Sequence, residues 1–173
     1  MVHFVGAGSG AADLITVRGA KLLGECDVVI YAGSLVNPAL LNYCRKDCRI
    51  YNSAEMTLEQ VIDAIRKAEA EGKTTVRLHT GDSSIYGAVR EQFDELDKLG
   101  IAYDVCPGVS AFCGAAASLK TEYTLPDVSQ TVIIRIVTET GCEMVIANGA
   151  KPALLYDIVA GKPVGTRFLA KEA

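Results

Sequence analysis

The start of the chain joins an apolar strand to a glycine-rich turn. Residues 2–5 are apolar except for His3, and three glycines spaced by two follow, at Gly6, Gly8 and Gly10. A helical pattern comes next, with apolar residues at Leu14, Val17, Ala20 and Leu23. Glycine is needed in such a turn because a Cβ would block positive φ angles and the close approach of a ligand. This strand end is therefore predicted to be a binding edge; a turn that binds nothing is the alternative.

Two ligands suit this turn, a dinucleotide and S-adenosylmethionine. The dinucleotide fingerprint also requires an acidic residue about 20 positions further on, at the end of the second strand, to hold the ribose. This chain has Tyr31 and Ala32 there, and the next carboxylate is Glu55. A nicotinamide-dependent oxidoreductase of the NAD(P)-binding Rossmann class therefore has only the glycine turn in its favour.

Composition limits the function classes. The chain has 173 residues, 50% of them apolar, which is enough for one domain and part of another. A net charge of −4, with no basic run longer than Arg45-Lys46 or Arg66-Lys67, argues against nucleic-acid binding. No apolar run has the length of a membrane span, and no signal-peptide pattern is present, so a cytoplasmic protein is predicted.

Six cysteines raise the question of a metal site or a disulfide. None forms a CxxC pair, and neither His3 nor His79 stands at ligand spacing from a cysteine, so no metal site is predicted. Cys44 and Cys48 lie about one helical turn apart. Free thiols in a reducing compartment are the favoured interpretation.

Strands and helices alternate along the next hundred residues. Strands are predicted at 27–31, 49–52, 75–79 and 101–105, and Thr57 with Gln60 forms a capping box for a helix that Gly72 ends. The fold class predicted is α/β, an open, mostly parallel five-stranded sheet with helices on both faces. In such a sheet the loops after the strands converge on one edge. We expect the four loops marked by Gly8, Gly33, Gly81 and Gly108 on that edge.

Four motifs in order resemble the S-adenosylmethionine-dependent tetrapyrrole methyltransferases. The resemblance covers about residues 1 to 135. Within the family, the chain looks most similar to the branch that methylates precorrin-4, or cobalt-precorrin-4, in cobalamin biosynthesis. It rests on the segments GAGSGAADLITVRG from Gly6, YAGSLV from Tyr31, HTGDSSIYG from His79 and PGVSAF from Pro107.

The resemblance implies S-adenosylmethionine as cofactor, S-adenosylhomocysteine as its product and a tetrapyrrole of the precorrin-4 type as substrate. Family members hold the cofactor in a cleft between two α/β domains. Ser9 stands where a proline is frequent. Carried over by position, the cofactor-binding residues would be Ser9, Thr80, Gly81, Asp82, Ile85, Tyr86, Pro107, Ser110 and Ala111. The substrate-binding residues would be Gly8, Tyr31, Gly33 and Ser34.

No catalytic residue can be assigned. Relatives that methylate uroporphyrinogen use an aspartate as base after the tyrosine of the second strand, where this chain has Ala32. Methyl transfer from a sulfonium is a direct displacement, so alignment of the reacting atoms can suffice. The hydroxyl groups of Tyr31, Ser34 and Tyr86 could orient the substrate or be satisfied by backbone. Asp82 could bind, cap the next helix, or do both, and His79 is predicted to be structural.

The domains predicted are a methyltransferase N-terminal domain over residues 1–123 and a second segment over 124–173. The second segment would hold the linker and first strand of the family's second domain, then a foreign, truncated α/β tail. Residues 136–173 are similar to the closing part of the amino-acid-kinase domain of glutamate 5-kinase, with strands at 143–147 and 164–169 and a helix at 152–159.

Such a tail would replace one wall of the cleft. Methyl transfer is then expected to be impaired, and an apolar face around Val128, Val132 and Ile134 would favour a homodimer. A non-catalytic chimera and the nicotinamide-dependent oxidoreductase are the alternatives.

Overall fold

The computed structural model describes residues 1–33, 35–126, 132, 134, 144–146 and 166–168. The chain divides into two compact units, Met1–Ala115 and Ala116–Ala173, and each is described by itself. In the described part, no helix is long and apolar enough to cross a membrane.

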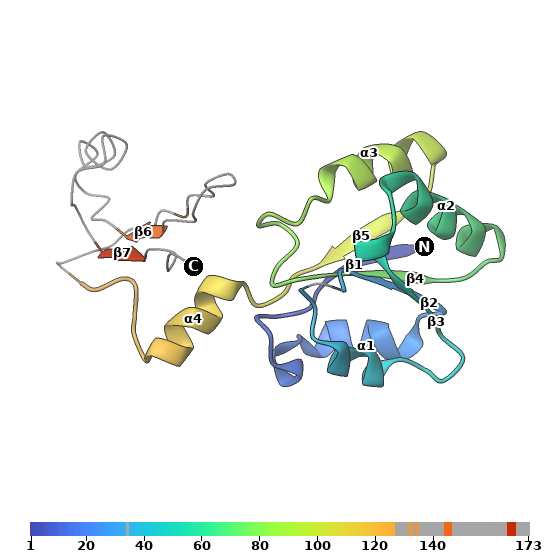
Figure 1. Cartoon of the computed structure of the whole chain (residues 1–173). Helices are drawn as coiled ribbons and strands as arrows, with labels where there is room; N and C mark the ends of the chain where they lie inside the picture. The colour runs from blue at the N-terminus through green and yellow to red at the C-terminus, as the bar shows by residue number, and fades with distance from the viewer. Residues whose placement is uncertain (34, 127–131, 133, 135–143, 147–165, 169–173) are drawn as a thin grey trace. The chain divides into compact units, whose positions relative to one another are not determined.

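The first unit is built on a five-stranded sheet in which every neighbouring pair is parallel (Figure 1). The strand order is β3-β2-β4-β1-β5. The strands are β1 (Val2–Gly6), β2 (Val28–Tyr31), β3 (Arg49–Asn52), β4 (Thr75–His79) and β5 (Tyr103–Cys106). The predicted fold class is confirmed, and the four glycine loops follow strands that all end at the same edge.

Helices cover both faces of this sheet. The α-helices of these layers are α1 (Val17–Glu25), α2 (Leu58–Ala70) and α3 (Arg90–Leu99), and short 3-10 helices are η1 (Ala12–Leu14), η2 (Pro38–Tyr43) and η3 (Ser53–Glu55). Helix α4 (Ala111–Leu119) has no buried residue and crosses the boundary between the two units. The capping box predicted for α2 is present: the Gln60 amide donates to the Thr57 hydroxyl, and the Thr57 amide to the Gln60 side chain. Gly72 follows the end of α2 with φ of 67°.

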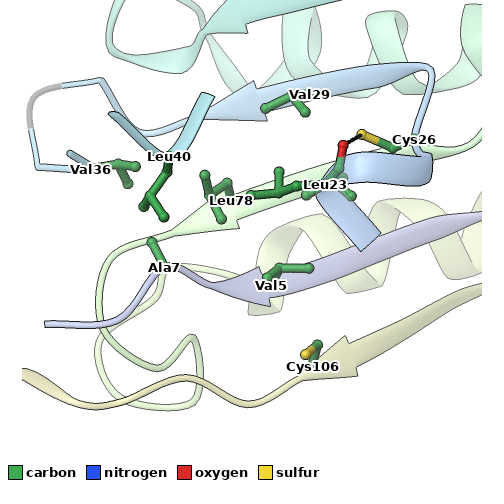
Figure 2. Close-up of a cluster of buried hydrophobic side chains, with 10 residues drawn as sticks. Val5, Ala7, Leu23, Cys26, Val29, Val36, Leu40, Leu78 and Cys106 are labelled. Atoms are coloured by element: carbon green, nitrogen blue, oxygen red, sulfur yellow. Dashed lines mark hydrogen bonds between the residues drawn. The ribbon is translucent and has the colours of Figure 1, made fainter. Parts of the chain in front are cut away.

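The apolar core lies in two layers because alternate residues of each strand point to opposite faces. On one face Val5, Val29 and Leu78 pack with Leu23 of α1 and Leu40 of η2 (Figure 2). The other face carries Phe4 and Ile30, which pack with Ile65 of α2 and Leu96 of α3. Burial on both faces explains why β2 is a continuous apolar run, whereas β4 is buried throughout although it carries the polar residues Thr75, Arg77 and His79.

Two predicted details are wrong. Leu14 belongs to η1 rather than to the following helix, and Val17, the first residue of α1, is 89% exposed. The reason is the cap: the Thr16 hydroxyl accepts from the Gly19 amide and starts the helix at a residue that faces solvent. Strand β5 begins at Tyr103 instead of residue 101, because the Ile101 amide donates to the Leu96 carbonyl at the end of α3.

In the second unit, β6 (Met144–Ile146) pairs antiparallel with β7 (Thr166–Phe168). Both strands lie inside the ranges predicted for the tail. The predicted helix at 152–159, Cys142 and Val128 lie outside the described residues, and the kinase resemblance of the tail stays a prediction.

Phe4→Ala tests the second core layer. The Phe4 ring is fully buried and meets the Phe93 ring edge-on at 4.7 Å and the Tyr103 ring at 5.9 Å. Its removal leaves a cavity, so the free energy of unfolding in urea should fall by about 3–5 kcal/mol. Val17→Ala is the control and should change it by less than about 0.5 kcal/mol. Equal effects would contradict this packing.

Candidate functional site

The strand order reverses at the β1–β4 pair. After β1 the chain moves to β2 and β3 on one side of the sheet, and after β4 it crosses to β5 on the other side. The chain leaving β1 and the chain leaving β4 enter helices that pack on opposite faces of the sheet, α1 and α3, and both leave from the carboxyl ends of adjacent strands. In open α/β sheets this is the position where ligands bind.

Main-chain hydrogen bonds tie the loops after β1 and β4 together. The Gly8 amide donates to the Gly81 carbonyl over 3.2 Å, and the Gly81 amide donates to the Gly8 carbonyl over 2.9 Å. Both residues have positive φ angles, 82° for Gly8 and 60° for Gly81. Because L side chains rarely adopt such angles, glycine is required for this pair by conformation.

The loop after β5 is held against the same pair by close backbone contact. A Cβ on Gly108 would lie 2.1 Å from the Gly81 carbonyl oxygen, and a Cβ on Gly6 would lie 2.6 Å from the Gly108 Cα. Neither could be accommodated without a backbone shift. We call Gly6, Gly8, Gly81 and Gly108 the glycine junction, since these four residues join three of the loops.

The Asp82 side chain stabilises the glycine junction by accepting hydrogen bonds from two of its loops. The carboxylate accepts the Gly108 amide and the Ser84 amide, each at 2.8 Å, and also the Ser84 hydroxyl. Partial burial on its own would raise the pKa of this carboxyl, but these hydrogen bonds lower it below its usual value. Asp82 is therefore ionised at neutral pH and links the β4 loop to the β5 loop.

The loop after β2 is held by an asparagine that the sequence reasoning missed. The Asn52 side-chain oxygen accepts the Gly33 amide over 3.1 Å and the Ala54 amide over 3.0 Å. A Cβ on Gly33 would lie 2.1 Å from that oxygen. A polar residue at the end of β3 was the only local signal for this contact. Ser34 lies outside the described residues.

The other predicted site residues differ in exposure. Thr80 is half-buried and Ser110 is 9% exposed, whereas Ile85 is 37% and Tyr86 76% exposed. Tyr86 has a φ of 57°, which is unusual for a bulky residue and marks a strained turn.

The remaining predicted residues lie in the loops after β1, β2 and β5 or directly beside those loops. Tyr31 and Ser9 are half-buried, and the exposed Ala111 begins α4. The Pro107 carbonyl accepts the Thr16 hydroxyl over 3.5 Å.

Three buried side-chain atoms in the described part of the chain have no hydrogen-bond partner: Ser9 Oγ, His79 Nε2 and Ser83 Oγ. Ser9 lies in the loop after β1, and His79 and Ser83 flank Gly81. An unpaired buried polar group costs about 1–3 kcal/mol. The His79 ring stacks on Phe4 at 5.9 Å, and burial, with the charge of Arg77, lowers its pKa to about 3. Neutral His79 therefore packs as part of the core layer.

The profile of the tetrapyrrole (corrin/porphyrin) methylases matches residues 1–164. The chain belongs to this family. The family prediction is thereby confirmed, and the match extends beyond residue 135, where the resemblance was expected to end.

Individual members of the family are closely similar. The chain is 60% identical to the cobalt-precorrin-4 C(11)-methyltransferase of Methanocaldococcus jannaschii over 133 residues. These aligned residues make up 77% of this chain and 51% of that protein. It is 51% identical over 137 residues to the precorrin-4 C(11)-methyltransferase of a Sinorhizobium species, 79% of this chain and 54% of that protein. The chain thus spans about half the length of these relatives.

Solved structures agree with the fold. A cobalt precorrin-4 methyltransferase structure has a TM-score of 0.74 and 42% identity, covering 76% of this chain and 55% of that one. The uroporphyrin-III C-methyltransferase of Thermus thermophilus, complexed with S-adenosylhomocysteine, has a TM-score of 0.64 at 22% identity. This match covers 98% of this chain and 82% of that one. The second likeness supports the fold alone.

Gly108→Ala tests the glycine junction. The new Cβ would meet the Gly81 carbonyl oxygen, so the loops must separate, and the free energy of unfolding should fall by about 1–3 kcal/mol. Gly24→Ala is the matched control: its Cβ lies 3.5 Å from the nearest atom, and alanine favours the helix by up to about 1 kcal/mol. A Gly108→Ala variant as stable as the parent chain would show that the loops do not touch.

His79→Gln tests the buried neutral imidazole. The folded-state pKa of about 3 lies below the unfolded value, so the unfolded chain alone binds this proton as pH falls through about 6.5. The contribution of neutral His79 to the free energy of unfolding is therefore complete above pH 6.5 and is lost progressively as the pH falls toward 3. Between about pH 7 and pH 5 the parent chain should lose about 2 kcal/mol more than the variant in urea unfolding. Parallel pH profiles would mean that His79 is hydrated.

Proposed function

We propose that the glycine junction and its three loops bind S-adenosylmethionine for methyl transfer to a ring carbon of a precorrin-4-type tetrapyrrole in cobalamin biosynthesis. The observation that carries this proposal is the interlocking of loops 6–10, 80–87 and 107–111 at the strand-order reversal. Those loops hold three of the four motifs that resemble the family. The names of the relatives supply the substrate class.

The charge of the loops favours a cationic cofactor. The three loops, residues 6–10, 80–87 and 107–111, contain one carboxylate, Asp82, and no lysine, arginine or histidine, and a second carboxylate, Asp13, lies in η1 after the first loop. Asp82 stays ionised at neutral pH. A sulfonium and an ammonium group are attracted to such a surface, whereas the pyrophosphate of a dinucleotide would be repelled by it.

Within this proposal the junction positions the cofactor by main-chain groups. Thr80, Gly81, Asp82 and Ile85 would hold the methionine part from the β4 loop, and Ser9, Tyr86, Pro107, Ser110 and Ala111 would complete the site. Gly8, Tyr31, Gly33 and Ser34 would face the tetrapyrrole. The predicted homodimer and the cytoplasmic location are part of the same proposal.

The chemistry asks for alignment rather than proton transfer. The sulfonium supplies an electrophilic methyl group, and the attacking ring carbon must approach it in line with the departing sulfur. Three loops joined by backbone contacts give a rigid edge, and misplacement by about 1 Å can cost on the order of a hundredfold in rate. Ala32 offers no base at the end of β2, which agrees with a site that acts by positioning.

Cofactor binding can be tested with a matched pair of glycine variants. Gly81 and Gly100 have nearly equal φ angles, 60° and 66°, but Gly100 ends α3 with open space around it. Gly81→Val and Gly100→Val therefore carry the same backbone strain, and only Gly81→Val should reduce S-adenosylhomocysteine affinity, by at least about tenfold in isothermal titration.

Two further measurements, label transfer and NAD binding, complete this test. Label transfer from S-adenosylmethionine to a precorrin-4 preparation, which is expected to be slow in the parent chain, should fall further with Gly81→Val and not with Gly100→Val. Binding of NAD in place of S-adenosylhomocysteine by the parent chain would favour the oxidoreductase. Equal affinities of the two variants, with circular dichroism unchanged, would place the site elsewhere.

A further inference from the structure

The β4 loop ends in a turn with an unusual backbone. Tyr86 and Ala88 have φ angles of 57° and 46°, in the left-handed region that residues other than glycine rarely adopt. Gly87 stands between them, and a Cβ on it would lie 2.1 Å from the Ser83 carbonyl oxygen. The turn therefore folds back closely on the earlier part of the same loop. We call residues 86–88 the strained turn.

The strained turn needs other parts of the structure to hold it. Each left-handed residue disfavours the observed conformation by a factor of about five to thirty relative to a right-handed backbone. Such strain persists only where the surrounding structure fixes it, and it is found most often at ligand-binding sites. Tyr86 is 76% exposed and Ile85, the residue before it, is 37% exposed, so their own side chains do little to hold the turn.

Gln92 of α3 reaches the strained turn from the interior. Its side-chain nitrogen donates to the Ala88 carbonyl over 3.0 Å, and the residue is only 5% exposed. Helix α3 begins at Arg90, and Val89 before it supplies no side-chain cap. The bond from Gln92 therefore joins the first turn of the helix to the last residue of the strained turn.

A buried arginine fixes the orientation of the Gln92 amide. The Arg77 Nε donates to the Gln92 side-chain oxygen over 2.9 Å, and the same guanidinium donates to the Ile30 carbonyl over 3.0 Å. A guanidinium has hydrogen-bond donors and no acceptor, so it selects the oxygen of the amide beside it. The nitrogen of Gln92 must then face the Ala88 carbonyl.

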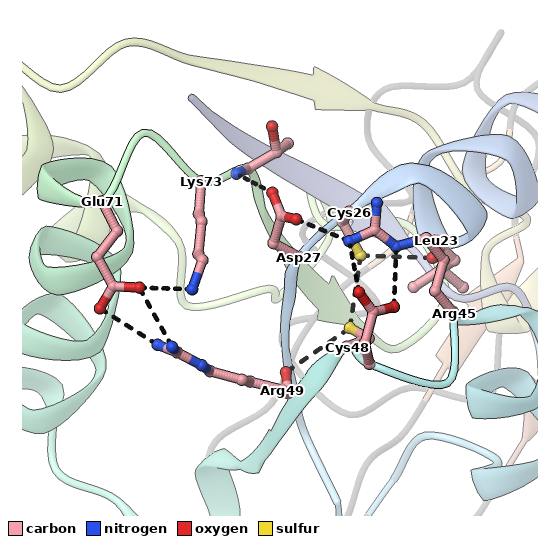
Figure 3. Close-up of polar contacts among 10 residues, drawn as sticks. Leu23, Cys26, Asp27, Arg45, Cys48, Arg49, Glu71 and Lys73 are labelled. Atoms are coloured by element: carbon pink, nitrogen blue, oxygen red, sulfur yellow. Dashed lines mark hydrogen bonds and ion pairs between the residues drawn. The ribbon is translucent and has the colours of Figure 1, made fainter.

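Arg77 has no carboxylate partner among the described residues, although it is only 6% exposed. Two arginines at the amino-terminal edge of the sheet differ from it, since Arg45 pairs with Asp27 at 2.8 Å and Arg49 with Glu71 at 3.2 Å (Figure 3). Burying a cation without a counter-charge is costly. An apolar residue in place of Arg77 would avoid this cost but could not orient the amide that reaches the strained turn.

We propose that Gln92, oriented by Arg77, is a positioning residue that holds the strained turn in its cofactor-binding conformation. The inference rests on the proposed function, in which Ile85 and Tyr86 belong to the S-adenosylmethionine site. The apparent affinity for a ligand falls with the fraction of molecules in the binding-competent conformation. Release of the turn therefore weakens cofactor binding while the residues that contact the cofactor stay the same.

Gln92→Glu separates positioning from stability. The carboxylate keeps the bond from Arg77 and gives that cation a counter-charge, but it has no hydrogen to donate to the Ala88 carbonyl. Affinity for S-adenosylhomocysteine in isothermal titration should fall at least about tenfold, while the urea midpoint of unfolding should not decrease. Gln60→Glu on α2 is the matched control: it keeps the bond from the Thr57 amide and should leave the affinity within about twofold.

Ala88→Gly should rescue the Gln92→Glu variant. Glycine takes a φ of 46° without steric cost, so the turn depends less on the bond from Gln92. The double variant should bind S-adenosylhomocysteine at least about threefold more tightly than Gln92→Glu alone. Ala88→Gly by itself leaves Arg77 and Gln92 intact and should raise the urea midpoint, so the proposal stays testable even if Gln92→Glu does not fold. A lower midpoint would contradict the strain at Ala88.

Limited proteolysis tests the strained turn without a ligand. Chymotrypsin cleavage after the exposed Tyr86, identified by mass spectrometry, should be at least about fivefold faster in Gln92→Glu than in the parent chain. If the parent chain does not bind S-adenosylhomocysteine, the proposed function fails, and the cleavage rates still decide whether Gln92 holds the turn. Unchanged cleavage in Gln92→Glu, or unchanged affinity where the parent chain binds, would overturn the proposal.

Discussion

The reciprocal main-chain bonding of Gly8 and Gly81 is the contact on which the loop edge depends. It joins the ends of the two central strands of the sheet and is available only to residues that accept positive φ angles. Gly6 and Gly108 then bring the β5 loop to within van der Waals contact of the same point. The absence of four side chains, together with the Asp82 carboxylate that accepts the Gly108 amide, gives three loops a common fixed position.

This construction has an electrostatic consequence. Main-chain groups and the ionised Asp82 carboxylate line the edge. The three loops, residues 6–10, 80–87 and 107–111, contain no lysine, arginine or histidine. Asp82 both locks the loops and supplies their negative charge, so its two roles cannot be separated by a simple deletion. Under the proposed function, a surface of this kind would position a cationic group without side chains that must move.

The interior of the sheet tolerates buried polar groups next to this edge. Arg77 on β4 is 6% exposed, and its guanidinium donates to the Gln92 side chain at 2.9 Å and to the Ile30 carbonyl at 3.0 Å. Burial lowers its pKa to about 10. These bonds tie β4 to β2 and α3, and they offset part of the cost of removing a cation from water. His79, two residues further along the strand, remains neutral beside this charge.

Local features of the chain could be predicted because their causes lie within a few residues. The sequence by itself determined the strands at 49–52 and 75–79, the capping box of Thr57 and Gln60, and the glycine turns that follow the strands. Only the tertiary structure decided the strand order, the hydrogen bond from the Gly33 amide to the Asn52 side chain and the contact between the Cys26 and Cys48 sulfurs. These contacts join residues about twenty or more positions apart, and their geometry follows from how the crossover helices pack rather than from any local pattern.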